Sequence, residues 1–337
     1  MFRARIRQGA TGAQLLAPVR AHQQTAWFRK LSRPVSSPGL SWWLHNPGTL
    51  PYDRAHPYYA PEQLRMSAAH EQYALGRSPQ EYARLARQAE IMKPMTRRLF
   101  AEAGLQPGMR VVDLGSGAGD VCMLLAEMVG LSGTVIGLDL DKDALLHARE
   151  RAAAAGFANI TFAHSDFAHY VPDAPLDAIV GRLVLMYQAD PAAALAKLTT
   201  YLRPGGVVAF IEPWFQPPPG PESTVKTTIT CLVETLRRSG AQVDLGPRLH
   251  RVFQAAGLPL PNMRFEAVMD PREDSPLYEF VADTIAHLLP KAVEYGIPGA
   301  AELDIASIAR RMRAEMNAVG YAMLVAPMVC AWCTKAV

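Results

Sequence analysis

The residues best suited to chemistry in this chain stand in one short stretch, VVDLGSGAGD. Three glycines, Gly115, Gly117 and Gly119, alternate with small residues between two carboxylates, Asp113 and Asp120. Glycines allow the backbone to approach a ligand closely, and the first amides of a following helix bind polar groups. The stretch therefore predicts a loop that holds a nucleotide-like ligand.

The spacing of the glycines separates two kinds of ligand. A dinucleotide loop has glycines at its first, third and sixth positions, but here the sixth position is Asp120. Two carboxylates beside the loop repel a pyrophosphate and attract a cation. S-adenosylmethionine carries a sulfonium and an ammonium group, so we expect it as the cofactor.

The pattern Asp-x-Gly-x-Gly-x-Gly, which runs from Asp113 to Gly119, resembles motif I of class I S-adenosylmethionine-dependent methyltransferases. Residues 109–213 as a whole resemble the type 11 methyltransferases, a group that includes quinone C-methyltransferases. The matching features are the glycine turn, an acid for the ribose, an acid for the adenine, a loop and a Leu-x-Pro-Gly-Gly turn. The resemblance covers about a third of the chain and is specific to the cofactor fold.

Two acids follow the glycine turn at the ends of expected strands. Asp139 ends an apolar run about 20 residues past the turn, where an acid accepts both ribose hydroxyls. Asp141 is better explained as the N-cap of a helix over residues 142–155. The resemblance implies that Asp166 accepts from the adenine amino group and that Phe167 covers the ring.

An N-terminal helix often lies over the ligand in this fold, which makes Tyr73 a candidate contact; plain helix packing is the alternative. The cofactor site implied by the resemblance is therefore drawn from several elements: Asp113, Gly115, Ser116, Gly117, Gly119, Asp139, Leu140, Asp166, Phe167, Arg182 and Tyr73.

The acceptor is expected to lie beside the loop that leaves the fourth strand, because ligands bind at the carboxyl ends of parallel strands. Arg182 and Tyr187 on this loop and Glu212 at the end of the fifth strand are the candidate catalytic residues. Methyl transfer mainly requires alignment and exclusion of water, and a base is needed only when the acceptor loses a proton. We expect a small, fairly apolar acceptor, methylated on oxygen, nitrogen or carbon, and no metal.

Two alternatives remain at this stage. One is an NAD(P)-dependent oxidoreductase on a similar sheet. Asp120 argues against it, because a dinucleotide loop has a glycine at this position. The other is a non-catalytic homologue that binds the cofactor, because the sequence does not prove an acceptor site.

The elements that must position these residues predict an α/β fold with a doubly wound, seven-stranded, mostly parallel sheet. A helix is expected from Ser78, another from Met95 to Ala103, and helical insertions are expected to form a lid after the fifth strand. The expected strands cover residues 109–114, 134–138, 159–163, 176–180, 207–211, 263–268 and 321–333.

The chain divides into four expected parts. Residues 1–65 are a basic leader, 66–108 a helical cap, 109–213 the cofactor-binding core, and 214–337 the lid with the last two strands. Thr227, Thr228, Thr230 and Met316 are candidates to line the acceptor pocket. The leader has three interpretations: a mis-called or disordered start, a targeting segment, or a genuine accessory segment.

Composition limits the class of protein. The 337 residues are 50% hydrophobic and 19% charged, with a net charge of +3. Seven basic residues and no acid lie in residues 1–52, so the rest of the chain carries −4. A mildly acidic body argues against nucleic acid. The expected partner is a small-molecule acceptor, and a homodimer stays open.

Four cysteines, Cys122, Cys231, Cys330 and Cys333, give no disulfide framework, which suits a reducing compartment. Cys330 and Cys333 are expected to point to opposite faces of a strand, and an arsenic site would need further cysteines near the methyl group. The longest apolar run is too short to span a bilayer. We expect a cytoplasmic protein, or a mitochondrial one if the chain is eukaryotic and its N-terminus genuine.

Overall fold

The structure, a computed structural model, describes residues 79–167, 169–218 and 222–336. The chain forms two units, Met1–Arg65 and Met66–Val337, and all described residues belong to the second. The expected leader and the candidate contact Tyr73 lie outside the described residues.

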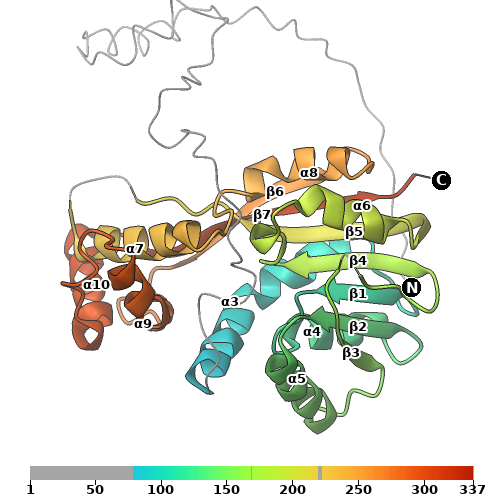
Figure 1. The fold of residues 1–337 in the computed structure, drawn as a ribbon. Helices are drawn as coiled ribbons and strands as arrows, with labels where there is room; N and C mark the ends of the chain where they lie inside the picture. The colour runs from blue at the N-terminus through green and yellow to red at the C-terminus, as the bar shows by residue number, and fades with distance from the viewer. Residues whose placement is uncertain (1–78, 168, 219–221, 337) are drawn as a thin grey trace, which may run out of the picture. The chain divides into compact units, whose positions relative to one another are not determined.

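The described residues form one seven-stranded sheet in the order β3-β2-β1-β4-β5-β7-β6 (Figure 1). Neighbouring strands from β3 to β5 pair in parallel, whereas β7 is antiparallel to both β5 and β6. This confirms the predicted doubly wound, mostly parallel α/β fold. The strands are β1 (Arg110–Leu114), β2 (Thr134–Asp139), β3 (Ile160–His164), β4 (Leu176–Arg182), β5 (Leu202–Pro213), β6 (Asn262–Asp270) and β7 (Met323–Thr334).

The central strands are buried on both faces, so successive residues enter different cores. In β1, Val111 belongs to one hydrophobic cluster and Val112 to the other. In β7, Cys330 and Cys333 likewise join opposite clusters, which confirms the prediction that they point to opposite faces.

Helices cover both faces of the sheet. Helices α3 and α4 contribute to the cluster of Val111, and α6 and α8 contribute to the cluster of Val112. The helices are α3 (Pro79–Ala103), α4 (Asp120–Val129), α5 (Lys142–Ala154), α6 (Pro191–Thr199), α7 (Thr224–Arg238), α8 (Leu249–Ala255), α9 (Leu277–Glu294) and α10 (Ile305–Val319), with short 3-10 turns η2 (Leu185–Tyr187) and η3 (Gly246–Arg248).

Two local predictions were wrong. The expected break before Met95 is absent, because α3 continues through Pro94 as one helix. The Pro-Gly-Gly segment is part of β5 instead of a turn before it, and Gly205 takes a φ of 74° where the register with β4 shifts. Proline and glycine are breakers only where the surrounding packing does not impose another path.

Helices α7, α9 and α10 pack on one another, and α9 also contacts α3 and β7. Figure 1 shows this group apart from the helices that flank the parallel strands. Within the described residues, no helix has the length and apolar character needed to cross a membrane.

Candidate functional site

The loop after β1 needs its glycines for different reasons. Gly115, Gly117 and Gly119 take φ values of 64°, 50° and 83°, a region that L side chains rarely occupy. A Cβ atom at Gly115 would lie 2.4 Å from the Cγ2 atom of Val184, whereas one at Gly117 would meet nothing within 4 Å. The backbone at Gly117 is therefore open to a ligand.

Asp139 joins the end of β2 to this loop. Its Oδ2 atom accepts a hydrogen bond from the Gly117 amide at 2.8 Å, and its Oδ1 atom accepts one from the Asp141 amide at 2.8 Å. Burial raises the pKa of Asp139, and the amides of Asp141 and Gly117 oppose that shift. The Asp141 side chain accepts from the amides of Asp143 and Ala144, which confirms that it caps α5.

A cavity of about 1040 Å³ begins at this loop and extends to α7, α9 and α10. The hydroxyl of Ser116, on its wall, is buried and has no hydrogen-bond partner among the described residues. A buried polar atom without a partner indicates a missing ligand or water. Eight of the predicted site residues line the cavity: Gly115, Ser116, Gly117, Asp139, Leu140, Phe167, Arg182 and Tyr187.

The expectation that Asp113 and Asp120 both face the ligand as carboxylates was wrong for Asp113. Asp113, in the middle of β1, is 1% exposed, does not line the cavity, and accepts a hydrogen bond from the Cys122 thiol. Burial raises its pKa to about 7. Asp120 does line the cavity, but it forms an ion pair with Arg151 at 2.7 Å.

Gly119 and Asp166 also lie outside the cavity wall. A Cβ atom at Gly119 would lie 3.1 Å from the Cβ atom of Ala148, so this glycine allows α4 and α5 to approach. The carboxylate of Asp166 lies 3.6 Å from the His169 ring. Its backbone carbonyl accepts hydrogen bonds from the amides of His169 and Tyr170. Only its neighbour Phe167 faces the cavity, so the predicted contacts of Gly119 and Asp166 with the cofactor gain no support.

Glu212 was predicted to face the acceptor, and the structure corrects this. The side chain is fully buried and absent from the cavity wall. Its Oε1 atom accepts from the amides of Val184 (3.1 Å) and Leu185 (2.8 Å), and its Oε2 atom accepts from the Met186 amide (3.2 Å). Burial raises its pKa to about 7, against the effect of these amides. Glu212 holds the loop after β4 and cannot reach an acceptor.

That loop carries the other two catalytic candidates into the cavity. Arg182 donates to the Thr96 hydroxyl at 3.2 Å; burial lowers its pKa, and the carboxylates of Asp120 and Asp113 oppose the shift. Leu183 between the candidates has a φ of 56°, an uncommon conformation for a branched residue. Such strain is often found at functional sites.

Sequence reasoning missed one face of α3. Residues of α3 that recur every three to four positions, and so share one face of the helix, line the cavity. Tyr82 at one edge of this face stacks on His147 of α5, with ring centroids 4.5 Å apart. The signal was present as a period of three to four residues. The residues of this face are Glu81, Tyr82, Arg84, Leu85, Gln88, Ile91, Met92 and Met95.

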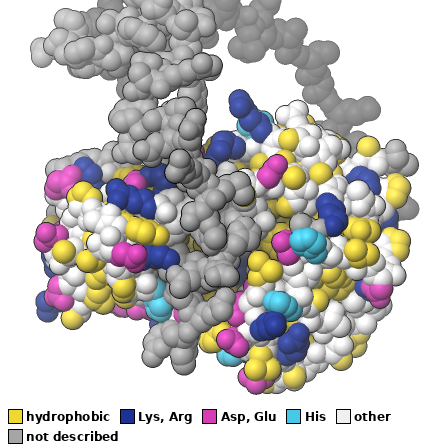
Figure 2. Space-filling model, viewed as in Figure 1, with side chains coloured by type: hydrophobic (Ala, Val, Ile, Leu, Met, Phe, Trp, Pro, Cys, Tyr) yellow, Lys and Arg dark blue, Asp and Glu magenta, His cyan; other side chains and the backbone are white. Residues whose placement is uncertain are grey.

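The far end of the cavity is mostly apolar. Met316 lines it as predicted, but Thr227, Thr228 and Thr230 do not. Other faces of α7, α9 and the last strands supply the wall, through Val225, Ile229, Leu232, Val233, Phe280, Val281, Phe265, Val268, Met323, Leu324, Val325 and Met328. On the described surface that Figure 2 shows, basic and acidic side chains are interspersed.

Comparisons with known proteins find similarity to methyltransferases. A family model described as a methyltransferase domain matches residues 105–257. The chain is 37% identical over 114 residues to an arsenite methyltransferase from Aquipseudomonas alcaligenes, a match that covers 32% of this chain and 33% of that protein. It is 33% identical over 144 residues to aklanonic acid methyltransferase from a Streptomyces species, which covers 42% of this chain and 64% of that protein.

A solved structure of an S-adenosylmethionine-dependent methyltransferase from Aquifex aeolicus has a TM-score of 0.39 and 22% identity, and the match covers 51% of this chain and 82% of that one. The match spans less than two thirds of the length of each of the two curated relatives, the arsenite methyltransferase and the aklanonic acid methyltransferase. The family match contains the glycine loop and Asp139. Residues 105–257, which carry these two features, match a methyltransferase domain.

Proposed function

We propose that this chain transfers a methyl group from S-adenosylmethionine to a small, mostly apolar acceptor. One observation carries the proposal: a single cavity joins the glycine loop and Asp139 to the apolar surfaces of α3, α7 and α9. Such a cavity has room for a cofactor and an acceptor side by side. The proposal covers oxygen, nitrogen and carbon acceptors.

The residues around the loop fit the cofactor. Ser116 offers a buried hydroxyl without a described partner, and the backbone at Gly117 is open. Asp139 offers carboxylate oxygens for ribose hydroxyls, and Leu140 and Phe167 offer apolar surface for a ring. When bound, the cofactor supplies a methyl group activated by a sulfonium.

The task left to the protein is to align the acceptor and exclude water. Arg182 and Tyr187 line the cavity on the loop that Glu212 holds, so we assign them to acceptor positioning. Tyr187 is the remaining candidate for accepting a proton, since Glu212 is used by backbone amides.

The proposal assigns a role to each part of the chain after residue 65. Residues 109–213 hold the cofactor, and the helical cap at 66–108 covers it through α3. Residues 214–337 supply the lid, in which α7, α9 and α10 enclose the acceptor.

The cysteines argue against arsenite as the acceptor, although one relative bears the name of an arsenite methyltransferase. All four cysteines of the chain are in the described part, all are buried, and none lines the cavity. Burial raises the pKa of Cys330 to about 12 and that of Cys333 to about 11. Thiolates are the form of cysteine that binds metals, so these sulfurs are poor arsenic ligands.

Two titrations and one turnover assay test the proposal. Calorimetry should show binding of S-adenosylhomocysteine and none of NAD⁺ or NADP⁺, which separates a methyltransferase from an oxidoreductase. Cofactor labelled in the methyl group, incubated with an acceptor panel, should then yield a labelled product. Nicotinamide cofactor binding in place of S-adenosylhomocysteine would refute the proposal. Cofactor binding without turnover on any acceptor would favour the non-catalytic alternative.

A further inference from the structure

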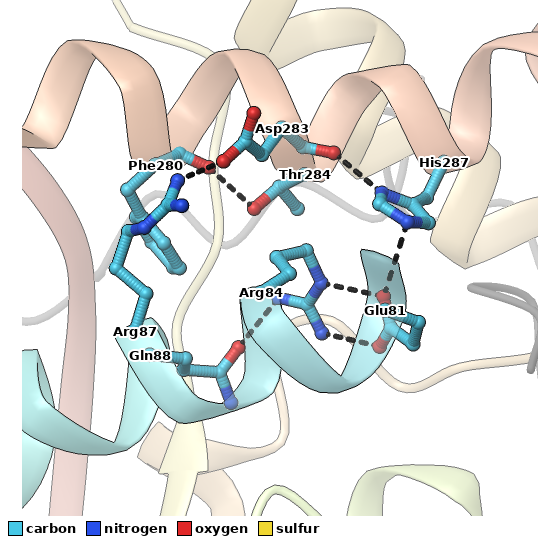
Figure 3. A network of polar contacts seen from close by, with 8 residues as sticks. All are labelled: Glu81, Arg84, Arg87, Gln88, Phe280, Asp283, Thr284 and His287. Carbon is cyan, nitrogen blue, oxygen red and sulfur yellow. Dashed lines mark hydrogen bonds and ion pairs between the residues drawn. The ribbon is translucent and has the colours of Figure 1, made fainter. Parts of the chain in front are cut away.

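A polar segment interrupts the apolar wall of the cavity. It consists of Glu81, Arg84 and Gln88 on α3 and Thr284 on α9, all of which line the cavity; we call these four residues the polar wall. Figure 3 shows α3 and α9 facing each other, with Arg84 and Thr284 between them and Gln88 on the other side of Arg84. The next residues along the same face of α3, Ile91 and the methionines, are apolar.

The polar wall has a fixed geometry. The Nε and Nη2 atoms of Arg84 donate to the two carboxylate oxygens of Glu81 at 2.8 and 2.7 Å, and its Nη1 atom donates to the Gln88 Oε1 atom at 2.9 Å. Since the carbonyl of Gln88 accepts from Arg84, its amide NH₂ group is directed away from Arg84. The Thr284 hydroxyl donates to the Phe280 carbonyl at 2.8 Å, which leaves its oxygen able to accept.

Stability alone does not explain this arrangement. Glu81 and Arg84 are 1% and 2% exposed. Replacing a buried ion pair with apolar side chains is often neutral or stabilising, because the charges lose their hydration. A bidentate pair in the mostly apolar acceptor end of the cavity therefore points to recognition of a ligand.

The charges of this end of the cavity are balanced. The Glu81 carboxylate faces the Arg84 guanidinium and lies 3.8 Å from the His287 ring. Lys226 forms an ion pair with Glu222 at 2.7 Å. Glu315 accepts from two amides that open α7, at 3.0 and 3.2 Å. Among the described residues that line this end, two acids, Glu81 and Glu315, match two bases, Arg84 and Lys226. The wall therefore has no net formal charge, which favours an uncharged ligand.

We propose that the polar wall recognises an uncharged oxygen, a carbonyl or a hydroxyl, on an otherwise apolar acceptor. The Gln88 amide donates to this oxygen. Gln88 lies eight residues from Thr96, the partner of Arg182, which is about 12 Å along a helix. This span admits an acceptor with two fused rings and a substituent. This inference rests on the proposed function.

Three naphthalene probes test it: 2-acetylnaphthalene, its apolar counterpart 2-ethylnaphthalene, and the anion 2-naphthoate. Their binding to the full chain, saturated with S-adenosylhomocysteine, is measured by probe fluorescence. 2-Acetylnaphthalene should bind about fivefold to tenfold more tightly than either of the others, the gain of one buried hydrogen bond. Gln88→Leu should remove the preference over 2-ethylnaphthalene.

Arg87→Leu is the matched control. Arg87 is one residue from Gln88 and forms an ion pair with Asp283 between the same two helices (Figure 3), but it does not line the cavity. This variant should keep the preference, which shows that loss in Gln88→Leu does not come from looser helix docking. Equal melting temperatures of the two variants establish that both fold.

Equal or tighter binding of 2-ethylnaphthalene or 2-naphthoate by the unmodified chain would overturn the inference, as would binding of none of the probes. An undiminished preference in Gln88→Leu would overturn it too. Failure of the unmodified chain to bind S-adenosylhomocysteine overturns the proposed function and this inference together. Retained binding without a probe preference overturns the inference alone.

Discussion

The carboxylate of Asp139 accepts a hydrogen bond of 2.8 Å from the amide of Gly117. This bond joins the end of β2 to the middle of the loop after β1, two segments 22 residues apart. It directs a carboxylate and an open backbone position into the same end of the cavity. The cofactor end of the site is organised by this pair.

Asp139→Ala should weaken binding of S-adenosylhomocysteine by about 10-fold to 100-fold, because a hydrogen bond to a charged group contributes about 1.5–3 kcal/mol. Calorimetry measures the affinity. Asp143→Ala is the control, since Asp143 is an exposed acid at the start of α5 that does not line the cavity. Equal affinities of the two variants would count against the assigned ribose contact.

Gly117→Arg should abolish cofactor binding and leave the sheet folded. Nothing lies within 4 Å of a Cβ atom at this position, so the new side chain fills ligand space without displacing a neighbour. Gly156→Arg matches it, because Gly156 also has a positive φ (78°) and open surroundings but does not line the cavity. Circular dichroism monitors folding and calorimetry monitors binding; intact binding in Gly117→Arg would show that the cofactor lies elsewhere.

The free energy of unfolding should fall as the pH rises from about 4 to about 7. Asp113 and Glu212 have native pKa values raised to about 7 from 3.8 and 4.5. Between these values the unfolded state has released its protons while the native state retains them, so each carboxyl favours folding at low pH and loses that contribution toward pH 7. The change is on the order of 3 kcal/mol for each group.

Urea denaturation at a series of pH values measures this fall in the unmodified chain, Asp113→Asn and Glu212→Gln. Each variant should show a shallower dependence over the same range, because it lacks one of the two carboxyls. Superimposable pH dependences for all three proteins would refute the assignment of raised pKa values to these groups.

Arg84→Leu alone should destabilise the protein by about 3–5 kcal/mol, because it leaves the Glu81 carboxylate buried without its guanidinium. The double variant Glu81→Leu, Arg84→Leu should recover most of this loss. Arg87→Leu, which breaks an exposed pair with Asp283, should cost about 0–1 kcal/mol. Denaturant titrations give the three values, and a double variant no more stable than Arg84→Leu would contradict this description of the pair.

Short-range signals allowed the cofactor end to be predicted from sequence. The glycine loop, Asp139 and the Asp141 cap depend on residues within a few positions of one another. The structure places Gly115, Gly117 and Asp139 on the cavity wall and Asp141 at the start of α5. Glu212 could not be interpreted in this way, because its partners are amides of residues 184–186 on another strand's loop. Asp113 was wrongly predicted to face the ligand, because neighbouring residues in the sequence do not reveal that a carboxylate inside a parallel strand is buried.

The acceptor end was the least predictable. Glu81, Arg84 and Gln88 resemble the solvent face of an amphipathic helix when they are considered alone. Glu81 and Arg84 are nevertheless buried and Gln88 is partly buried, and α9, about 200 residues later, packs against α3. Tertiary packing decides a contact between residues so far apart in the sequence, and local sequence patterns do not predict it.

The most direct test of the account is a crystal structure of the full chain with S-adenosylhomocysteine. We expect the ribose hydroxyls at the Asp139 carboxylate and the sulfur facing the apolar cavity beside Arg182 and Tyr187. A ligand bound away from Asp139, or with its sulfur directed to solvent, would contradict it.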